Sequence, residues 1–242
     1  MNLDNRTALV SGANRGIGRA IVAALLGTDI AKVYAAARDP ASLIDFGDPR
    51  VIPLALDITD AAQVRAAAER ATDVDLLINN AGVAGFASLL DGEHSLAERD
   101  MQTNYFGTLN MVRAFVPVLE RQPSAAIVNL VTIAAFANFP FLGGYSASKA
   151  ALFLLSQGIR IELAPRGIAV HTVNPGPIDT DLAADLAMDK AEVQATAEQI
   201  LRGLERGDAD IFPDPTSQQM FEVWQGDYRA LERMVQDMLS AA

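Results

Sequence analysis

The chain has 242 residues, half of them apolar, which is enough for a large α/β domain with a substantial core, and we expect a single domain spanning residues 1–242. Its formal charge of -11 argues against a nucleic-acid partner or an anionic membrane, because either normally requires a basic surface. Cysteine is absent, which excludes disulfides and thiolate chemistry and removes the commonest soft metal ligand, so we predict no metal site.

The start of the chain leaves little room for a targeting segment. A Gly-rich turn begins within a dozen residues of Met1. No apolar run reaches the ~18 residues that a membrane span needs. We therefore expect a cytoplasmic protein.

The Gly-rich turn lies between a predicted strand, Thr7–Ser11, and a predicted apolar helix over residues 19–26. Its glycines follow the spacing Gly-x-x-x-Gly-x-Gly, at Gly12, Gly16 and Gly18. Glycines let the backbone turn tightly and let a pyrophosphate approach the N–H groups of a helix N-terminus, where the helix dipole favours negative charge. A glycine turn between a strand and a helix indicates dinucleotide binding rather than a plain turn.

The second predicted strand, Lys32–Ala37, ends where the adenosine ribose of a dinucleotide would lie. An acidic residue there binds the 2′-hydroxyl of NAD, whereas a basic residue accommodates the 2′-phosphate of NADP. Arg38 follows this strand, and Arg15 in the glycine turn can reach the same phosphate. Two guanidinium groups suit a dianion, so we predict a preference for NADP(H) over NAD(H). The alternative is that Arg38 pairs with Asp39 at the surface.

Strands and helices alternate through the rest of the chain. Further strands are predicted at residues 51–56, 74–78, 125–131 and 168–173, and helices at residues 61–71 and 96–119. This alternation predicts an α/β fold, a Rossmann-type doubly wound parallel sheet of about seven strands with helices on both faces. The fourth strand ends in Asn79-Asn80-Ala81-Gly82, at the sheet edge where ligands bind in such folds.

A phenol and an amine lie four positions apart at Tyr145 and Lys149, before the helix-forming run of residues 150–161. Residues at this spacing share one face of a helix. A free phenol titrates near pH ~10, and a nearby positive charge lowers that pKa, which suits the phenol for proton transfer. Alone, the pair equally fits a packed Tyr and a solvated Lys.

The ordered set of these motifs resembles the short-chain dehydrogenase/reductase family, whose members transfer hydride between a nicotinamide and a carbonyl or alcohol. The resemblance covers about residues 7–180. Besides the residues already named, it rests on Asp57, Asn104 and Pro175-Gly176. It implies that the cofactor is bound by Gly12, Asn14, Arg15, Gly16, Ile17, Gly18, Arg38, Asp57, Ile58, Asn79, Ala81, Gly82, Tyr145, Lys149, Pro175, Gly176, Ile178 and Thr180.

The resemblance also implies which part of the cofactor individual residues contact. Asp57 and Ile58 would contact the adenine, and Asn79 would support the ribose region. Ile178 and Thr180 would hold the nicotinamide carboxamide.

The catalytic residues implied by the resemblance are Tyr145, Lys149, Thr132 and Asn104. Tyr145 would be the general acid, while Lys149 would bind the nicotinamide ribose and lower the pKa of the phenol. Asn104 would hold a proton-relay water, although an Asn in mid-helix usually faces solvent.

Thr132 departs from the pattern, because the family usually has Ser at this position, thirteen residues before the Tyr. A Thr hydroxyl still donates a hydrogen bond to a substrate oxygen. Its extra methyl group stiffens χ1 and narrows the site.

The resemblance places five apolar residues beside the substrate pocket, namely Phe86, Phe136, Phe139, Phe141 and Leu142. The reaction we predict is therefore reduction of an apolar, cyclic or aromatic ketone or aldehyde by NADPH. The alternatives are that these residues are core, that the enzyme works in the oxidative direction, or that the chain is a dinucleotide sensor without turnover. His94 and His171 match no family position.

Three features surround the predicted site. Residues 181–206 fall where the family has a mobile substrate lid, and the tail, residues 207–242, lacks the usual Gly-rich ending. The helices that hold Asn104 and Tyr145 commonly form the subunit interface in this family, so we expect a homodimer or homotetramer.

Overall fold

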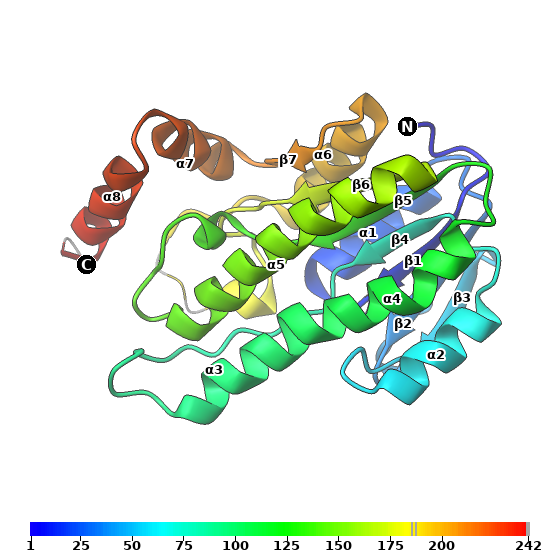
Figure 1. Cartoon of the computed structure of the whole chain (residues 1–242), viewed down its shortest axis with the longest axis horizontal. Coiled ribbons are helices and arrows are strands. Elements are labelled where there is room, and N and C mark those ends of the chain that lie inside the picture. Colours follow the sequence, from blue (N-terminus) through cyan, green and yellow to red (C-terminus); the bar gives the residue numbers. More distant parts are fainter. Residues whose placement is uncertain (185, 187, 241–242) are drawn as a thin grey trace.

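A parallel sheet of seven strands forms the centre of the computed structural model, which describes residues 1–184, 186 and 188–240 (Figure 1). The strand order is β3-β2-β1-β4-β5-β6-β7. The strands are β1 (Thr7–Ser11), β2 (Lys32–Ala37), β3 (Val51–Ala55), β4 (Leu76–Asn79), β5 (Ala125–Leu130), β6 (Ile168–Val173) and β7 (Asp210–Ile211). The predicted doubly wound α/β fold is therefore confirmed.

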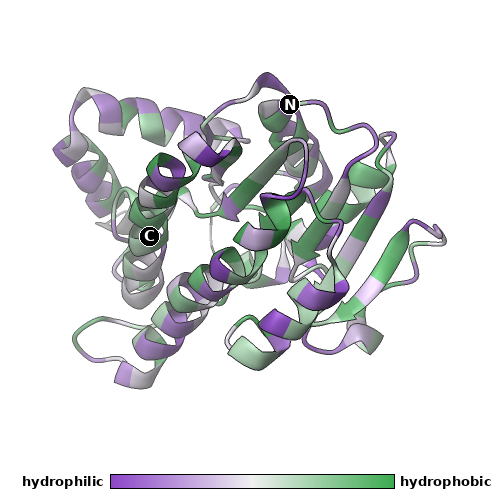
Figure 2. Cartoon of the chain, turned by 45° about the vertical axis from the view of Figure 1, so that its right-hand side comes forward, coloured by the Kyte–Doolittle hydropathy of each residue, from purple (hydrophilic) through white to green (hydrophobic). Residues whose placement is uncertain are grey.

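Both faces of the sheet are buried, which is why the strands are almost continuously apolar. Successive side chains of a strand point to opposite faces, so Leu9 and Leu77 enter one core while Val10 and Ile78 enter the other. Figure 2 shows the strands mostly in the hydrophobic colour and the helices mixed. Full burial of one such side chain stabilises the fold by about 1.5–3 kcal/mol.

Two layers of helices cover the sheet (Figure 1). On one face α1 (Gly16–Leu26) packs against α6 (Val193–Arg206). The other face is covered by α2 (Ala61–Arg70), α4 (Thr108–Leu119) and α5 (Gly143–Leu163). In the described part of the chain, no helix is long and apolar enough to cross a membrane.

The helix predicted over residues 96–119 is not one regular helix. It begins as α3 (His94–Asp100), passes through seven residues of the wider π-helix, η2 (Met101–Gly107), and continues as α4. Such π segments are rare and frequently occur at functional sites. Here the wider turn contains Asn104, which is fully buried and does not face solvent.

The predicted lid and the tail differ in how they pack. Helix α6 belongs to the core, because Ile200 and Leu204 are fully buried against α1. Residues 185 and 187 of the predicted lid lie outside the described residues. Beyond β7 the tail forms two packed helices, α7 (Pro215–Gly226) and α8 (Tyr228–Ser240), and its residues 241–242 are also outside that range (Figure 1).

Helix α7 is joined to the loop after β5 by five aromatic side chains, which we call the aromatic cluster: Phe136, Phe153, Phe212, Phe221 and Trp224. The rings of Phe212 and Phe221 stack with their centroids 3.9 Å apart. Phe136 lies 5.2 Å from Trp224, centroid to centroid, and contacts all the other members. Phe136 therefore attaches the tail to the loop after β5.

Candidate active site

A cavity of about 810 Å³ lies at the carboxyl ends of β1, β4 and β5. In the sheet order, β1 and β4 are the neighbours at which the chain changes direction. Ligands bind outside the carboxyl ends of the strands at such a switch point. The cavity is lined by residues from the glycine turn, from the segment after β4 and from α5, so the fold brings the separate sequence motifs together.

Two of the glycines are required by the backbone of the turn. Gly12 has a φ of +66° and Gly16 a φ of +52°, in the left-handed region that favours glycine. A Cβ atom on Gly12 would also lie 2.9 Å from the Cα of Ala81, and one on Gly18 would clash with the Asn80 side chain. The turn is therefore packed directly against the segment that follows β4.

The N-terminus of α1 faces the cavity without a side-chain cap. Arg15 occupies the N-cap position but makes no capping hydrogen bond, and the first turn contains no acidic residue. Gly16 and Ile17 of that first turn line the cavity. Backbone N–H groups at such a helix end bind anions well. The turn fits the pyrophosphate of a dinucleotide.

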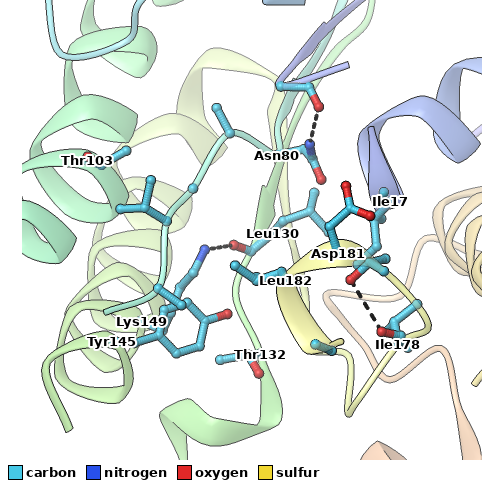
Figure 3. Close-up of a pocket in the computed structure, with 18 of the residues that line it drawn as sticks. Ile17, Asn80, Thr103, Leu130, Thr132, Tyr145, Lys149, Ile178, Asp181 and Leu182 are labelled. Carbon is cyan, nitrogen blue, oxygen red and sulfur yellow. Dashed lines mark hydrogen bonds between the residues drawn. The ribbon is translucent and has the colours of Figure 1, made fainter. Parts of the chain in front are cut away.

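Asn80, rather than Asn79, supports the glycine turn. Its amide donates hydrogen bonds to the carbonyl oxygens of Ser11 (2.9 Å) and Gly12 (3.1 Å) (Figure 3). Asn79 points into the core, where its amide donates to Asn129 at 2.9 Å, and it does not line the cavity. The role predicted for Asn79 at the ribose is therefore not supported by its position, because the side chain is committed to Asn129.

The proposed adenine and carboxamide contacts all line the cavity. Asp57 and Ile58 lie at one end, where the Asp57 carboxylate accepts hydrogen bonds from the backbone and hydroxyl of Thr59 (2.9 and 2.7 Å). Ile178 and Thr180 lie on the segment after β6. Ala81, Gly82, Pro175, Gly176 and Asn14 also line it.

Both predicted 2′-phosphate ligands are exposed beside the cavity. Arg38 lines it and does not pair with Asp39, whose carboxylate instead accepts a hydrogen bond from the backbone N–H of Ala41 at 3.0 Å. Arg15 lies 3.7 Å from Asp181, Nη1 to Oδ2, and both side chains are largely exposed. Exposed pairs of this kind stabilise little, so Arg15 can exchange this partner for an anionic ligand.

Tyr145 and Lys149 project from the first turns of α5 into the cavity (Figure 3). The Lys149 ammonium is buried and donates a hydrogen bond to the carbonyl of Leu130 at 2.7 Å. Its Nζ lies 5.8 Å from the centroid of the Tyr145 ring. The segment after β4 packs closely here, because a Cβ on Gly82 would lie 3.0 Å from Asn104 Oδ1 and 3.4 Å from the Lys149 Nζ.

The proton affinities of the pair differ from the expectation. Burial raises the pKa of Tyr145 to about 12, a hydrogen bond with the Thr132 side chain opposes that rise, and the charge of Asp100 adds to it. Burial lowers the pKa of Lys149 to about 8, against the effect of Asp100. The prediction that Lys149 lowers the pKa of Tyr145 is not met in this structure, because burial dominates and the ammonium is directed to Leu130.

Thr132 follows β5 and lies beside Tyr145 (Figure 3). Its hydroxyl donates to the carbonyl of Pro175 at 3.1 Å and accepts from the backbone N–H of Ala134 at 3.3 Å. The Pro175 contact ties the loop after β5 to the loop after β6. A substrate oxygen would compete with Pro175 for the hydroxyl proton.

Asn104 lies behind the cavity wall rather than in it. Its Oδ1 accepts from the backbone N–H of Val83, and its Nδ2 donates to the Val83 carbonyl and to the hydroxyl of Ser148, all at 2.9 Å. The Ser148 hydroxyl in turn donates to the carbonyl of Tyr145 at 2.7 Å. Asn104 therefore joins the segment after β4 to the helix that carries Tyr145, and its role with a relay water stays a prediction.

Three residues at the site escaped the sequence reasoning. Asp214 had a signal in the Pro that follows it, since Asp then Pro is typical of a helix start. Asp214 accepts a hydrogen bond from the backbone N–H of Gly176 at 2.8 Å. Met220, which lines the cavity from α7, and the buried Asp100 had no sequence signal.

The two histidines, which match no family position, do not line the cavity. His171 is buried in β6, where its Nδ1 is 2.7 Å from the carbonyl oxygen of Asp208. Burial lowers its pKa. His94 is exposed and lies 3.5 Å from Glu98, Nε2 to Oε1.

Comparisons with known proteins agree with this geometry. A model of the short chain dehydrogenase family matches residues 6–191. An uncharacterized oxidoreductase of Staphylococcus saprophyticus is 30% identical over 220 residues, which cover 85% of this chain and 94% of the relative. Carbonyl reductase (NADPH) 2 of Sus scrofa is 31% identical over 192 residues, 78% of each chain.

A solved structure is similar over nearly the whole length. The crystal structure of a short chain dehydrogenase from Burkholderia cenocepacia J2315 in complex with NADP has a TM-score of 0.93 and 38% identity, covering 97% of this chain and 99% of that one. The fold agrees with these matches. This chain belongs to the short-chain dehydrogenase/reductase family of oxidoreductases.

Proposed function

We propose that this protein reduces an apolar ketone or aldehyde to an alcohol with NADPH, using Tyr145 as the general acid. The observation that carries the proposal is the position of the Tyr145 phenol beside the Thr132 hydroxyl in the cavity (Figure 3). Two hydroxyl donors at one point suit a single substrate oxygen on which negative charge develops.

The protonation state of Tyr145 is compatible with the reductive direction. Because burial raises the pKa of Tyr145 to about 12, the phenol carries its proton at neutral pH. A protonated phenol is an acid for carbonyl reduction, whereas alcohol oxidation needs the phenolate as base. Oxidation remains the alternative, since the same groups serve both directions.

The residues present fit a reduced nicotinamide dinucleotide. When bound, this cofactor supplies the hydride that the carbonyl carbon receives. The glycine turn and the N-terminus of α1 would hold the cofactor, and Lys149 lies in the same cavity beside Tyr145. We propose that Arg15 and Arg38 select NADP(H).

The substrate end of the cavity supports an apolar partner. Phe139, Phe141 and Leu142 from the loop after β5 line it, together with Phe86 and Met220 from other segments. These side chains are apolar, so the substrate proposed is apolar, cyclic or aromatic. The proposed substrate lid spans residues 181–206, and the part of it that forms α6 packs in the core.

We also propose a homodimer or homotetramer formed through α5. Its outer face exposes Leu154 (66% exposed) and Ile161 (76% exposed), with Gly158 between them. A Cβ atom placed on Gly158 would have no atom of the described structure within 4 Å, so this face is open. Spacings of four and three residues place them on one side of the helix. An apolar stripe of this kind suits a second copy of the chain.

The test is to incubate the protein with NADPH and a panel of aromatic and cyclic ketones and to follow the loss of NADPH absorbance. Turnover supports the proposal. NADPH binding without turnover in either direction would favour a dinucleotide sensor. Turnover only with the matching alcohols and NADP, and not with the ketones and NADPH, would favour oxidation.

A further inference from the structure

Asp100 is a charged side chain in the interior, at the end of α3 where the π-helix η2 begins. It is 0% exposed. Burying a carboxylate is costly unless hydrogen bonds and opposite charges compensate it. The proposed reaction, as set out above, gives Asp100 no task.

One oxygen of Asp100 holds the segment after β4. Its Oδ2 accepts a hydrogen bond from the backbone N–H of Gly85 at 2.9 Å. One helical turn further on, Asn104 holds the N–H and carbonyl of Val83. A side chain on Gly85 would crowd this contact, since a Cβ there would lie 2.9 Å from the Cβ of Leu96 and 3.1 Å from Oδ2. Asp100 and Asn104 thus clamp residues 83–85 together.

The other oxygen of Asp100 has no hydrogen bond within the described structure. The cation beside it is Arg99, whose Nη2 lies 3.5 Å from Oδ1 and whose side chain is 48% exposed. Helix α5, which packs against α3, contributes Lys149 and Tyr145, and both sense the charge of Asp100. The segment of residues 80–87 contributes no titratable side chain. The negative charge therefore acts on the catalytic pair.

We propose that Asp100 is a positioning residue of this enzyme: its buried carboxylate clamps the segment after β4 with Asn104 and supplies the negative charge that balances Lys149. This inference deepens the proposed function and rests on it for the catalytic consequence. The electrostatic part can be tested without any substrate.

The direction of the effect is the same for both members of the pair. A negative charge favours the ammonium form of Lys149 and disfavours the phenolate form of Tyr145, so Asp100 raises the pKa of each. Carbonyl reduction needs both groups protonated. Removing the charge of Asp100 must therefore move the loss of activity at high pH to a lower pH.

The chain contains three lysines, Lys32, Lys149 and Lys190, which makes a direct titration practical. Protein labelled with ¹³C at the lysine Cε carbons gives three resonances, and Lys149→Arg identifies that of Lys149. In the ligand-free wild type we expect its midpoint at about pH 8. Asp100→Asn lowers this midpoint by roughly half a pH unit or more.

A comparison of Asp100→Asn with Asp100→Ser separates the effect of the charge from that of the contact with Gly85. Asp100→Asn keeps an oxygen for the Gly85 N–H, whereas Asp100→Ser removes both the charge and that contact. Both lower the Lys149 midpoint, and Asp100→Ser alone also raises the substrate KM. Glu98→Gln is the matched control, because Glu98 is on the same helix but 69% exposed, and it shifts the midpoint by less than ~0.2 pH unit.

The same variants are then assayed for ketone reduction across pH. The alkaline limb of the kcat profile moves to lower pH in Asp100→Asn and stays in place in Glu98→Gln. A folded Asp100→Asn or Asp100→Ser protein, checked by circular dichroism, with an unchanged Lys149 midpoint overturns the inference. A wild type that shows the expected titration but no turnover with any ketone would contradict the proposed function and leave the charge role of Asp100 standing.

Discussion

At the scale of single residues, the site depends on a few hydroxyl and amine groups held in a largely buried setting. The Thr132 hydroxyl is engaged with Pro175, and the Lys149 ammonium with Leu130. Both partners are backbone carbonyls, so each side chain is oriented before any ligand arrives. This pre-organisation lowers the cost of forming the reactive arrangement.

Thr132 offers a matched pair of substitutions. Thr132→Val keeps the shape but removes the hydroxyl, and we expect it to lower kcat by about 100-fold or more, as for loss of an oxyanion donor. Thr132→Ser keeps the hydroxyl and removes a methyl group, so kcat should stay within about fivefold while discrimination between ketones of different size falls. Steady-state kinetics on the ketone panel measures both. Equal activity of Thr132→Val and the wild type would exclude the hydroxyl from the reaction.

The two arginines beside the cavity determine the cofactor preference in our account. Arg15→Ala with Arg38→Ala removes the guanidinium groups proposed for the 2′-phosphate, and we expect kcat/KM for NADPH to fall about 100-fold or more, with that for NADH changed by less than about fivefold. Arg19→Ala on α1 is the control, because Arg19 does not line the cavity. Comparable efficiency of the wild type with NADH and NADPH would contradict this role.

At the scale of elements, the tail is connected to the site through α7. Asp214 caps α7 by accepting from the Ser217 N–H at 2.9 Å, and its second oxygen binds the Gly176 N–H at 2.8 Å. A Cβ on Gly176 would lie 2.8 Å from Asp214 Oδ1, so the contact needs the glycine. The same carboxylate thus positions both the tail and the loop after β6.

Asp214→Ala tests this connection. It removes a helix cap and leaves a buried N–H without an acceptor, so we expect a loss of about 2–4 kcal/mol in unfolding free energy and weaker NADPH binding. Glu192→Ala is the matched control, because Glu192 caps α6 through Gln194 and is exposed. It should cost about 1 kcal/mol and leave NADPH binding unchanged. Urea unfolding and a fluorescence titration measure the two effects, and equal NADPH affinity in both variants would contradict the connection.

Elements with a strong local pattern were predictable from the sequence, and those set by distant contacts were not. Strands β1, β2 and β6 begin and end as predicted, because their apolar runs are bounded by polar or glycine residues. The π-helix η2 was missed, since hydrophobic periodicity does not distinguish it from a regular helix. Helix α7 was missed although Asp214 and Pro215 mark its start.

The same distinction holds within the candidate site. The cavity-lining residues Gly12, Lys149 and Thr180 were named from motifs, because a motif keeps its place in the fold. The burial of Asp100 was not predictable, because an acid on a helix normally faces solvent and here contacts with α5 and with the segment after β4, distant in sequence, bury it.

At the scale of the whole molecule, helix α5, which carries Tyr145 and Lys149, also exposes an apolar face. If copies of the chain associate there, Leu154→Glu with Ile161→Glu places charges in the interface and should convert the oligomer to monomers. Size-exclusion chromatography with light scattering measures the mass. Glu162→Gln is an exposed control on the same helix. A monomeric wild type at micromolar concentration would contradict the proposed interface.

The central claim is that Tyr145 delivers the proton in an NADPH-dependent reduction, and Tyr145→Phe tests it most directly. This variant keeps the ring and removes the hydroxyl, so the cavity and the fold should be retained. We predict that kcat for the ketone found in the panel falls by about 100-fold or more, while NADPH binds with unchanged affinity. A kcat within about threefold of the wild type would contradict the account, because the proton would then come from another group.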